Sequence, residues 1–203
     1  MINKIKYLLW RFRNFFWLNK PTLQEYFFQL ALKEVGIHWG TIKINHHEGR
    51  SWHKKTGWVP LIFPKKMIRI ISKPEINKTC DYFFKGVVSD SRQWIKKYNN
   101  INPSDYGRDQ SKKYTLDMDY YVKLKAARFG LSPTGDCPWS YRFFESIMCY
   151  AIPVIGDEEL DIYSKEFHYL RDSTAHKYDF QLCLDNLKIL KINHTLEKYI
   201  LKK

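Results

Sequence analysis

The chain has 203 residues, 44% of them hydrophobic and 17% aromatic, which is enough to bury one sizeable core. Its formal net charge of +13 suits a polyanionic partner, either nucleic acid, an anionic membrane or a phosphorylated substrate. The four cysteines are scattered without a C-x-x-C pair or zinc-site spacing, so the sequence indicates a reduced cytosolic compartment.

The first 20 residues predict an amphipathic helix. Apolar residues recur there every three or four positions, lysines and arginines take the other faces, and two tryptophans add rings typical of a bilayer boundary. Arg11 and Arg13 interrupt the apolar run, so the helix cannot span a membrane or serve as a signal peptide. Two interpretations remain. The helix packs on the domain, or it lies on the anionic inner face of the cytoplasmic membrane and makes the protein peripheral.

Residues 21–79 predict a short, mostly helical N-terminal segment. A helix is expected over residues 23–35, ended by Gly36. Apolar runs at 58–63 and 67–72 predict two strands joined by a turn at 64–66. His46, His47 and Glu48 fall in a polar stretch that is typical of a solvated loop. A catalytic base or an acceptor-binding role is the alternative for them, because histidine titrates near neutrality.

Residues 82–88 predict a strand, and Ser89–Ser91 give a capping signal for a helix over 92–98. Arg92 would stand in the first turn of that helix, where the dipole disfavours a cation. The mismatch is explained if Arg92 meets an anionic ligand, and a surface ion pair is the alternative. A polar loop over 99–116 follows. Asp117 and Asp119 then cap the helix expected over 120–128, although such a D-x-D triplet also suits a divalent cation.

The stretch from 118 to 157 predicts helix, strand, loop, helix and strand in succession, with the second helix over 141–150 and a buried strand over 151–155. The loop carries Gly135 and Asp136, and the second helix opens at Pro138 or Ser140. Unpaired N–H groups and the positive dipole end of that helix suit a diphosphate. Three neighbouring residues complete this expected site: Tyr141, Arg142 as a bidentate fork, and Glu145 as an acceptor for two ribose hydroxyls.

Strands alternate with helices from 82 to 155, so the fold class expected is α/β, a Rossmann-like parallel sheet flanked by helices. Ligands of such sheets bind at the carboxyl ends of the strands. Residues 180–201 predict one amphipathic helix or a pair that packs on the sheet.

The same stretch resembles the C-terminal, nucleotide-sugar-binding half of exostosin-type glycosyltransferases. Members of that family carry a pattern like P-x-G-[DN], then S-x-R-x-x-E-A, then G-x-I-P-V-I. The matching residues here are Pro133, Gly135, Asp136, Ser140, Arg142, Glu145 and Ile152–Ile155, with Lys85, Gly86 and Arg92 in register upstream. The chain departs from the pattern at Cys149-Tyr150-Ala151, where the family usually has glycine.

The resemblance implies a GT-B-type domain over residues 80–203 that binds a nucleoside-diphosphate sugar through Arg92, Gly135, Asp136, Ser140, Tyr141 and Arg142, with Glu145 on the ribose and Lys85 and Gly86 nearby. It implies no cofactor, and a glycan acceptor held by residues 21–79 or by a partner chain. The alternatives are a truncated, non-catalytic nucleotide-sugar-binding module and, on charge alone, a nucleic-acid-binding protein without a known motif.

Overall fold

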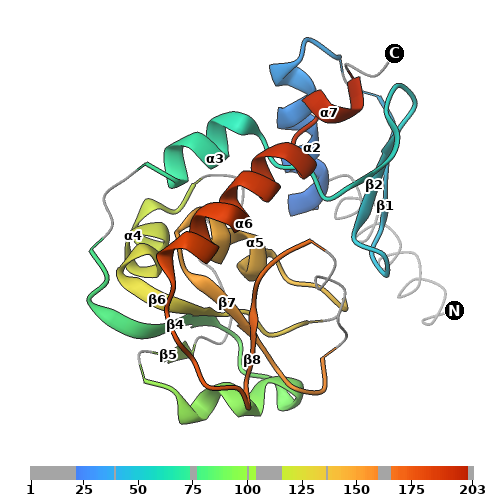
Figure 1. Cartoon of the computed structure of the whole chain (residues 1–203). Helices are drawn as coiled ribbons and strands as arrows, with labels where there is room; N and C mark the ends of the chain where they lie inside the picture. Colours follow the sequence, from blue (N-terminus) through green and yellow to red (C-terminus); the bar gives the residue numbers. More distant parts are fainter. Residues whose placement is uncertain are drawn as a thin grey trace, which may run out of the picture.

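A five-stranded parallel sheet forms the centre of the molecule, as the sequence predicts. In the computed structural model, residues 22–38, 40–73, 77–99, 101–103, 116–135, 137–159 and 166–200 are described. The strands are β4 (Cys80–Gly86), β5 (Ile101–Pro103), β6 (Ala127–Leu131), β7 (Ile152–Ile155) and β8 (Leu170–Arg171). Their order is β5-β4-β6-β7-β8, and every neighbouring pair is parallel (Figure 1).

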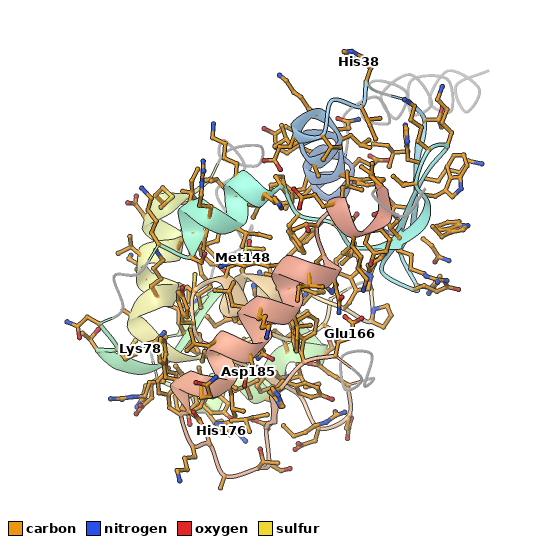
Figure 2. All side chains as sticks on the ribbon, turned by 45° about the horizontal axis from the view of Figure 1, so that its top comes forward. His38, Lys78, Met148, Glu166, His176 and Asp185 are labelled. Atoms are coloured by element: carbon orange, nitrogen blue, oxygen red, sulfur yellow. The ribbon has the colours of Figure 1, made fainter. Side chains whose placement is uncertain are left out.

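Helices cover both faces of this sheet, and its central strands β6 and β7 are largely buried. The helices are η1, a 3₁₀ helix (Asp90–Lys97), α4 (Met118–Ala126), α5 (Tyr141–Met148) and α6 (Phe180–Asn193). Phe83 of β4 packs on Tyr120 of α4, whereas its neighbour Tyr82 packs on Tyr98, which follows η1. Successive strand residues point to opposite faces, so α4 and η1 lie on opposite sides. Met148 lies near the centre of the molecule, where α5 packs against α6 (Figure 2).

The N-terminal part is not mostly helical, contrary to the sequence prediction. Between α2 (Leu23–Glu34) and α3 (Lys65–Ile71), the strands β1 (Ile42–Asn45), β2 (Arg50–His53) and β3 (Gly57–Pro60) form an antiparallel sheet. The polar stretch after residue 37 therefore forms three strands, and His46, His47 and Glu48 lie in the exposed β1–β2 turn, as the loop interpretation predicts. Gly49 and Gly57 have φ of +58° and +67°, a conformation that glycine adopts without a steric penalty.

The prediction of a strand over residues 67–72 is wrong, because these residues belong to α3. Met67, Ile68 and Ile71 are buried on one side of this helix, a spacing that fits a helical face. Its first turn is capped from a distance. The Glu34 carboxylate at the end of α2 accepts hydrogen bonds from the Lys65 amide (2.7 Å) and the Lys66 amide (3.0 Å). This tertiary cap fixes a helix where the apolar run alone favours a strand.

Two hydrophobic clusters divide the chain differently from the expected boundary after residue 79. α3 packs into the large cluster with the parallel sheet. The C-terminal helix α7 (Glu197–Ile200) instead joins a small cluster with α2, in which Leu196 packs with Phe28 and Leu32. The C-terminal region is thus a pair of helices, one of the two expected arrangements. Within the described ranges, the helices are all too short or too polar to cross a bilayer.

Tyr150 ends α5 in a left-handed conformation, at the place where the sequence lacks the glycine of the family pattern. Its φ is 55°, and the Ala151 amide donates to the Ser146 carbonyl (2.9 Å) to close the helix. An L-residue there costs about 1–2 kcal/mol. Burial of the ring and a hydrogen bond from the Tyr150 hydroxyl to the Ser72 carbonyl (2.9 Å) offset this cost.

Candidate anion-binding site at the carboxyl edge of the sheet

The strand order creates a switch point between β4 and β6. From β4 the chain moves outward to β5 and then crosses to the other side of β4 to form β6. This is the 2-1-3-4-5 order of doubly wound sheets, in which connections leave in opposite directions and open a crevice at the strand ends. The segments that follow β4 and β6 face each other across this crevice, and they carry most of the residues predicted to bind a diphosphate.

Arg92 joins the ends of the two switch-point strands. Its Nε donates to the Thr134 carbonyl beyond β6 (2.7 Å), and its Nη1 donates to the Val87 carbonyl beyond β4 (3.0 Å). A Cβ atom on Gly135 would lie 2.5 Å from Nη2 of Arg92, so a larger residue would displace the guanidinium. Arg92 is thus held by two backbone carbonyls beside a glycine.

Arg142 reaches the same crevice from the first turn of α5. Its Nε donates to the Lys85 carbonyl (3.2 Å), and its guanidinium lies 5.0 Å from the centre of the Phe84 ring. Gly86 is buried against the guanidinium and leaves no room for a side chain there. The Ser140 hydroxyl caps α5 by accepting from the Arg142 amide (3.2 Å), so that amide already has one partner.

The two arginines line one cleft of about 290 Å³. Five of the residues predicted to bind diphosphate line it together with Leu23, Cys137 and Trp139, namely Arg92, Gly135, Ser140, Tyr141 and Arg142. Lys85 and Gly86 lie directly behind Arg142, and Asp136 lies outside the described residues. No carboxylate is found among the described residues that line the cleft. Two arginine side chains bring positive charge to this cleft, which suits an anion.

The structure does not place Glu145 in this cleft. The Glu145 side chain has no solvent exposure, and its two oxygens accept hydrogen bonds from the Tyr120 hydroxyl (3.2 Å) and the Tyr121 hydroxyl (3.0 Å). Glu145 lies one helical turn after Arg142 on α5, as predicted, but its side chain points towards α4 and not into the cleft. A carboxylate enclosed in this way would have to leave both bonds to reach a ribose. The geometry therefore gives no support to its predicted role as a ribose ligand.

Glu159 is a residue of this region that sequence reasoning missed. It follows β7, and its Oε2 accepts a hydrogen bond from the Thr134 amide (3.0 Å). The carbonyl of the same residue, Thr134, accepts the hydrogen bond from Arg92. Burial raises the pKa of Glu159 above its usual range, although nearby Arg92 acts in the opposite direction. The available signal was the run of three acids, Asp157, Glu158 and Glu159, one residue after a buried strand, at the edge where parallel strands present their ligands.

Trp139 separates the cleft from a second cavity of about 400 Å³. The second cavity is lined in part by Glu48, Arg50, Trp58, Glu166 and His194. The β1–β2 turn is fastened to it, because Trp139 Nε1 donates to the His46 carbonyl (2.7 Å). The side chains of His46 and His47 are exposed on this turn, and neither lines either cavity. Of the three weak catalytic candidates, only Glu48 reaches a cavity.

Glu166 and His194 form a polar pair at the second cavity. His194 is buried, with Nδ1 2.7 Å from the Leu61 carbonyl and Nε2 3.1 Å from Glu166 Oε2. This hydrogen bond lowers the pKa of Glu166. Glu166 lies beside α6 on the side of the β1–β2 hairpin (Figure 2).

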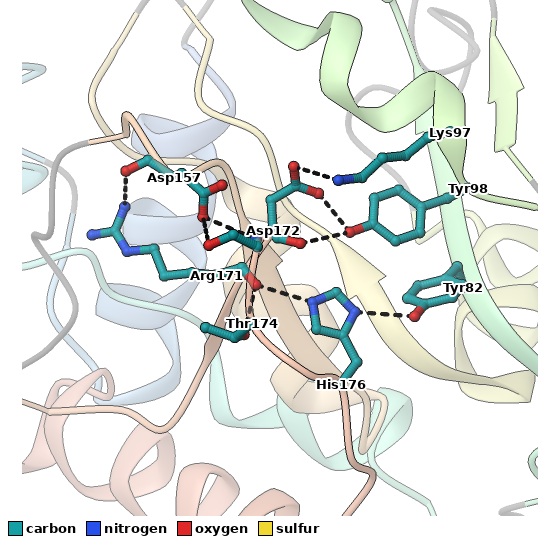
Figure 3. Close-up of polar contacts among 9 residues, drawn as sticks. Tyr82, Lys97, Tyr98, Asp157, Arg171, Asp172, Thr174 and His176 are labelled. Atoms are coloured by element: carbon teal, nitrogen blue, oxygen red, sulfur yellow. Dashed lines mark hydrogen bonds and ion pairs between the residues drawn. The ribbon is translucent and has the colours of Figure 1, made fainter.

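A network of polar contacts beyond β7 and β8 holds η1, the element that carries Arg92 (Figure 3). Asp172 accepts from the Tyr98 hydroxyl (2.5 Å) and pairs with Lys97 (2.8 Å). His176 bridges the Tyr82 hydroxyl and the Arg171 carbonyl, each at 3.0 Å. Burial, reinforced by Asp172, raises the pKa of Tyr98. These groups bond one another, so the network supports the site instead of offering a second one.

Asp117 and Asp119 behave as the capping interpretation predicts. The buried Asp117 carboxylate accepts from the Tyr120 amide (3.4 Å) and is the N-cap of α4, and Asp119 lies in the first helical turn. In the described parts of the chain, no three histidine, cysteine or acidic residues are grouped as metal ligands.

Comparison with models of known protein families gave no match, and comparison with functionally curated proteins gave none. Functional inference therefore rests on the geometry of the carboxyl edge.

Proposed function

We propose that this protein is a glycosyltransferase of exostosin-like type, and that the cleft at the switch point binds the diphosphate of a nucleoside-diphosphate sugar. One observation carries the proposal. Arg92 and Arg142, which lie 50 positions apart in the sequence, line the same cleft, each anchored to a backbone carbonyl at a strand end. Arginine forks match phosphate oxygens in geometry as well as in charge, so two of them suit a diphosphate better than a single phosphate.

The chemistry follows from where charge develops. When the bond between the sugar and the diphosphate breaks, its electron pair stays on the diphosphate oxygen. Donors already in place around that oxygen stabilise it, and removal of one such donor typically costs about 100-fold to 1,000-fold in rate. Arg92 is fixed by two carbonyls and Arg142 by a carbonyl and the Phe84 ring, so neither must be reorganised during the reaction.

The acceptor sugar is proposed to occupy the second cavity, across Trp139. Tryptophan rings present a broad apolar face, and carboxylates accept hydrogen bonds from sugar hydroxyls. Trp58 is 50% exposed at this cavity, and Glu48 and Glu166 both line it. Either carboxylate could accept the proton of the attacking hydroxyl, and the structure gives no preference between them. Residues 1–20 lie outside the described residues, so their placement on the inner membrane face stays a prediction.

A non-catalytic nucleotide-sugar-binding module is the second candidate. The observation that favours it is that the described lining of the arginine cleft contains neither a carboxylate nor a histidine to serve as a base. In that case a partner chain would supply the acceptor site, and the protein would bind donors without turnover.

A donor screen tests the proposal. Uridine and guanosine sugar nucleotides would be incubated with the full chain, and release of nucleoside diphosphate would be followed by mass spectrometry. Turnover of one donor that falls about 100-fold in Arg142→Lys, but not in the control Arg128→Lys, would support the enzyme. Arg128 pairs with Asp81 at an exposed site, so it controls for loss of an arginine. Binding of a donor without release in the wild type would favour the binding module, and neither binding nor release would refute both.

A further inference from the structure

A large open groove of about 1,100 Å³ lies between α3 and the C-terminal helices α6 and α7, away from the arginine cleft. Ile68, Tyr150 and Ile192 contribute apolar surface to it. Six cations border it: Lys65, Lys66, Arg69, Lys73, Lys191 and Lys198. Glu197 is the one acid among the described lining residues, and it pairs with Lys65. The groove thus combines an apolar floor with a basic rim.

The outer face of α3 carries cations only. Lys65, Lys66, Arg69 and Lys73 are all exposed. At 100° per residue, Lys65, Lys66 and Arg69 fall within an arc of about 100° on the helix, and Lys73 follows directly after its C-cap residue. The carboxylate of Glu34, at the end of α2, accepts hydrogen bonds from the Lys65 and Lys66 amides. Among the described residues, no ion pair involves the side chain of Arg69 or Lys73.

The outer face of α6 continues this surface and adds apolar side chains. Phe180, Leu184 and Ile192 are 41%, 38% and 51% exposed. Lys188 and Lys191 are exposed between them, and the five residues share an arc of about 120°. Asp185, at the border of this arc, is half-buried and accepts a hydrogen bond from Gln181 (3.0 Å) (Figure 2). A helix with large apolar residues among lysines is typical of one that lies in a membrane interface.

We propose that this basic groove, together with the outer face of α6, docks on the surface of a bilayer that contains acidic phospholipids. Clusters of four to eight lysines and arginines bind anionic headgroups, and the groove and α6 supply seven. Phe180, Leu184 and Ile192 insert to the depth of the headgroup boundary.

The charge alone would also suit nucleic acid, but three exposed apolar side chains gain nothing from phosphates and riboses. Single-stranded nucleic acid usually stacks on several aromatic rings, and Phe180 is the only ring exposed on the described part of this surface. The proposal does not depend on the glycosyltransferase assignment.

Flotation of the full chain with lipid vesicles tests whether this surface docks on an acidic bilayer. Vesicles of phosphatidylcholine alone are compared with a three-to-one mixture of phosphatidylcholine and phosphatidylserine. The charge variant is Arg69→Glu with Lys191→Glu, and the apolar variant is Leu184→Asn with Ile192→Asn. The control, Lys54→Glu with Lys55→Glu, makes the same change in net charge in the exposed β2–β3 turn.

The wild type and the control should bind only the acidic vesicles, and high salt should weaken this binding without abolishing it. The charge variant should partition at least about 30-fold more weakly, which corresponds to about 2 kcal/mol. The apolar variant should lose the salt-resistant part. Equal binding of all variants would overturn the proposal, because it would assign membrane binding to another part of the chain such as residues 1–20. An equal loss of binding in the charge variant and the control would also overturn it, because it would assign binding to net charge alone. Retention on a single-stranded RNA oligonucleotide without vesicle binding would also overturn it.

Discussion

Replacing Lys78 by methionine is expected to remove a pH-dependent part of the stability of this protein. Lys78 precedes β4, and its amino group is buried between the start of β6 and the end of α5. Its Nζ donates to the Ala127 carbonyl (2.7 Å) and the Cys149 carbonyl (3.2 Å) and lies 5.6 Å from the centre of the Tyr178 ring. Within the described part of the chain, no carboxylate forms a hydrogen bond or ion pair with this amino group. Burial lowers the pKa of Lys78 from 10.5 to about 8.

The direction of the pH dependence follows from the pH at which Lys78 loses its proton in the folded and in the unfolded chain. Below pH 8 both the folded and unfolded chains carry the charge, and the folded state pays the full cost of burying it. Between pH 8 and 10.5 the unfolded chain binds more protons than the folded chain, so the free energy of unfolding rises with pH. The shift corresponds to about 3 kcal/mol in total, of which about 1 kcal/mol is expected between pH 7 and pH 9. Burial also raises the pKa of Cys183 to about 11, and this thiol works in the opposite direction above its ordinary pKa of 9.0.

Urea unfolding of the wild type and Lys78→Met at pH 7 and pH 9, under reducing conditions, measures this contribution. Cys183 is present in both proteins, and because Lys78 lowers the pKa of Cys183, its removal raises that pKa further and changes the difference in the same direction. The free energy of unfolding of the wild type should rise relative to the variant by about 1 kcal/mol over this interval. Lys96→Met, at an exposed position on η1, is the control and should follow the wild type. If the difference between wild type and Lys78→Met is the same at both pH values, the buried charge is not what the structure indicates.

Three further substitutions test the local structure by urea unfolding. Glu34→Ala should lower the free energy of unfolding by about 0.5–2 kcal/mol because α3 loses its cap, whereas the exposed Glu158→Ala should leave it unchanged; equal effects would show that the cap contributes nothing. Asp117→Ala should cost a similar amount through α4, and added chelator should change neither wild type nor variant, so a chelator effect would favour a metal role. Tyr150→Gly should be about 1 kcal/mol more stable than Tyr150→Ala, since only alanine keeps the left-handed strain, and the reverse order would contradict it.

β4, β6 and β7 were predictable because each is a local pattern, whereas β5 lies in the stretch 99–116 that was expected to be a polar loop, and β8 was not predicted. Buried strands read as short apolar runs, and α5 shows its apolar face and its Ser140 cap in the sequence itself. α3 was not predictable in this way. Its apolar residues include three isoleucines, which favour strands, and its cap comes from Glu34, 31 positions away. Tyr150 shows the same limit, since its left-handed backbone depends on a carbonyl at Ser72.

The part of the candidate site that lies at the strand ends was predictable, because the order of the strands brings those residues together. Gly135, Ser140 and Arg142 adjoin one loop, and an alternating pattern of strands and helices brings that loop to the end of β4 and to Arg92. The spacing of Glu145 from Arg142 could not show which side of α5 faces α4, and the two tyrosine hydroxyls there decided its burial. Glu159 was missed because its role depends on a contact with the Thr134 amide.

Isothermal titration of nucleotides tests the central claim most directly. Uridine and guanosine diphosphates and monophosphates would be titrated into the wild type, Arg142→Ala and the control Arg128→Ala, with thermal melting of each protein as a check on folding. The account predicts that a diphosphate binds more tightly than the matching monophosphate, that Arg142→Ala abolishes this preference, and that Arg128→Ala keeps it. Equal binding of diphosphate to wild type and a folded Arg142→Ala, or no binding of either diphosphate to the wild type, would contradict the assignment of the cleft.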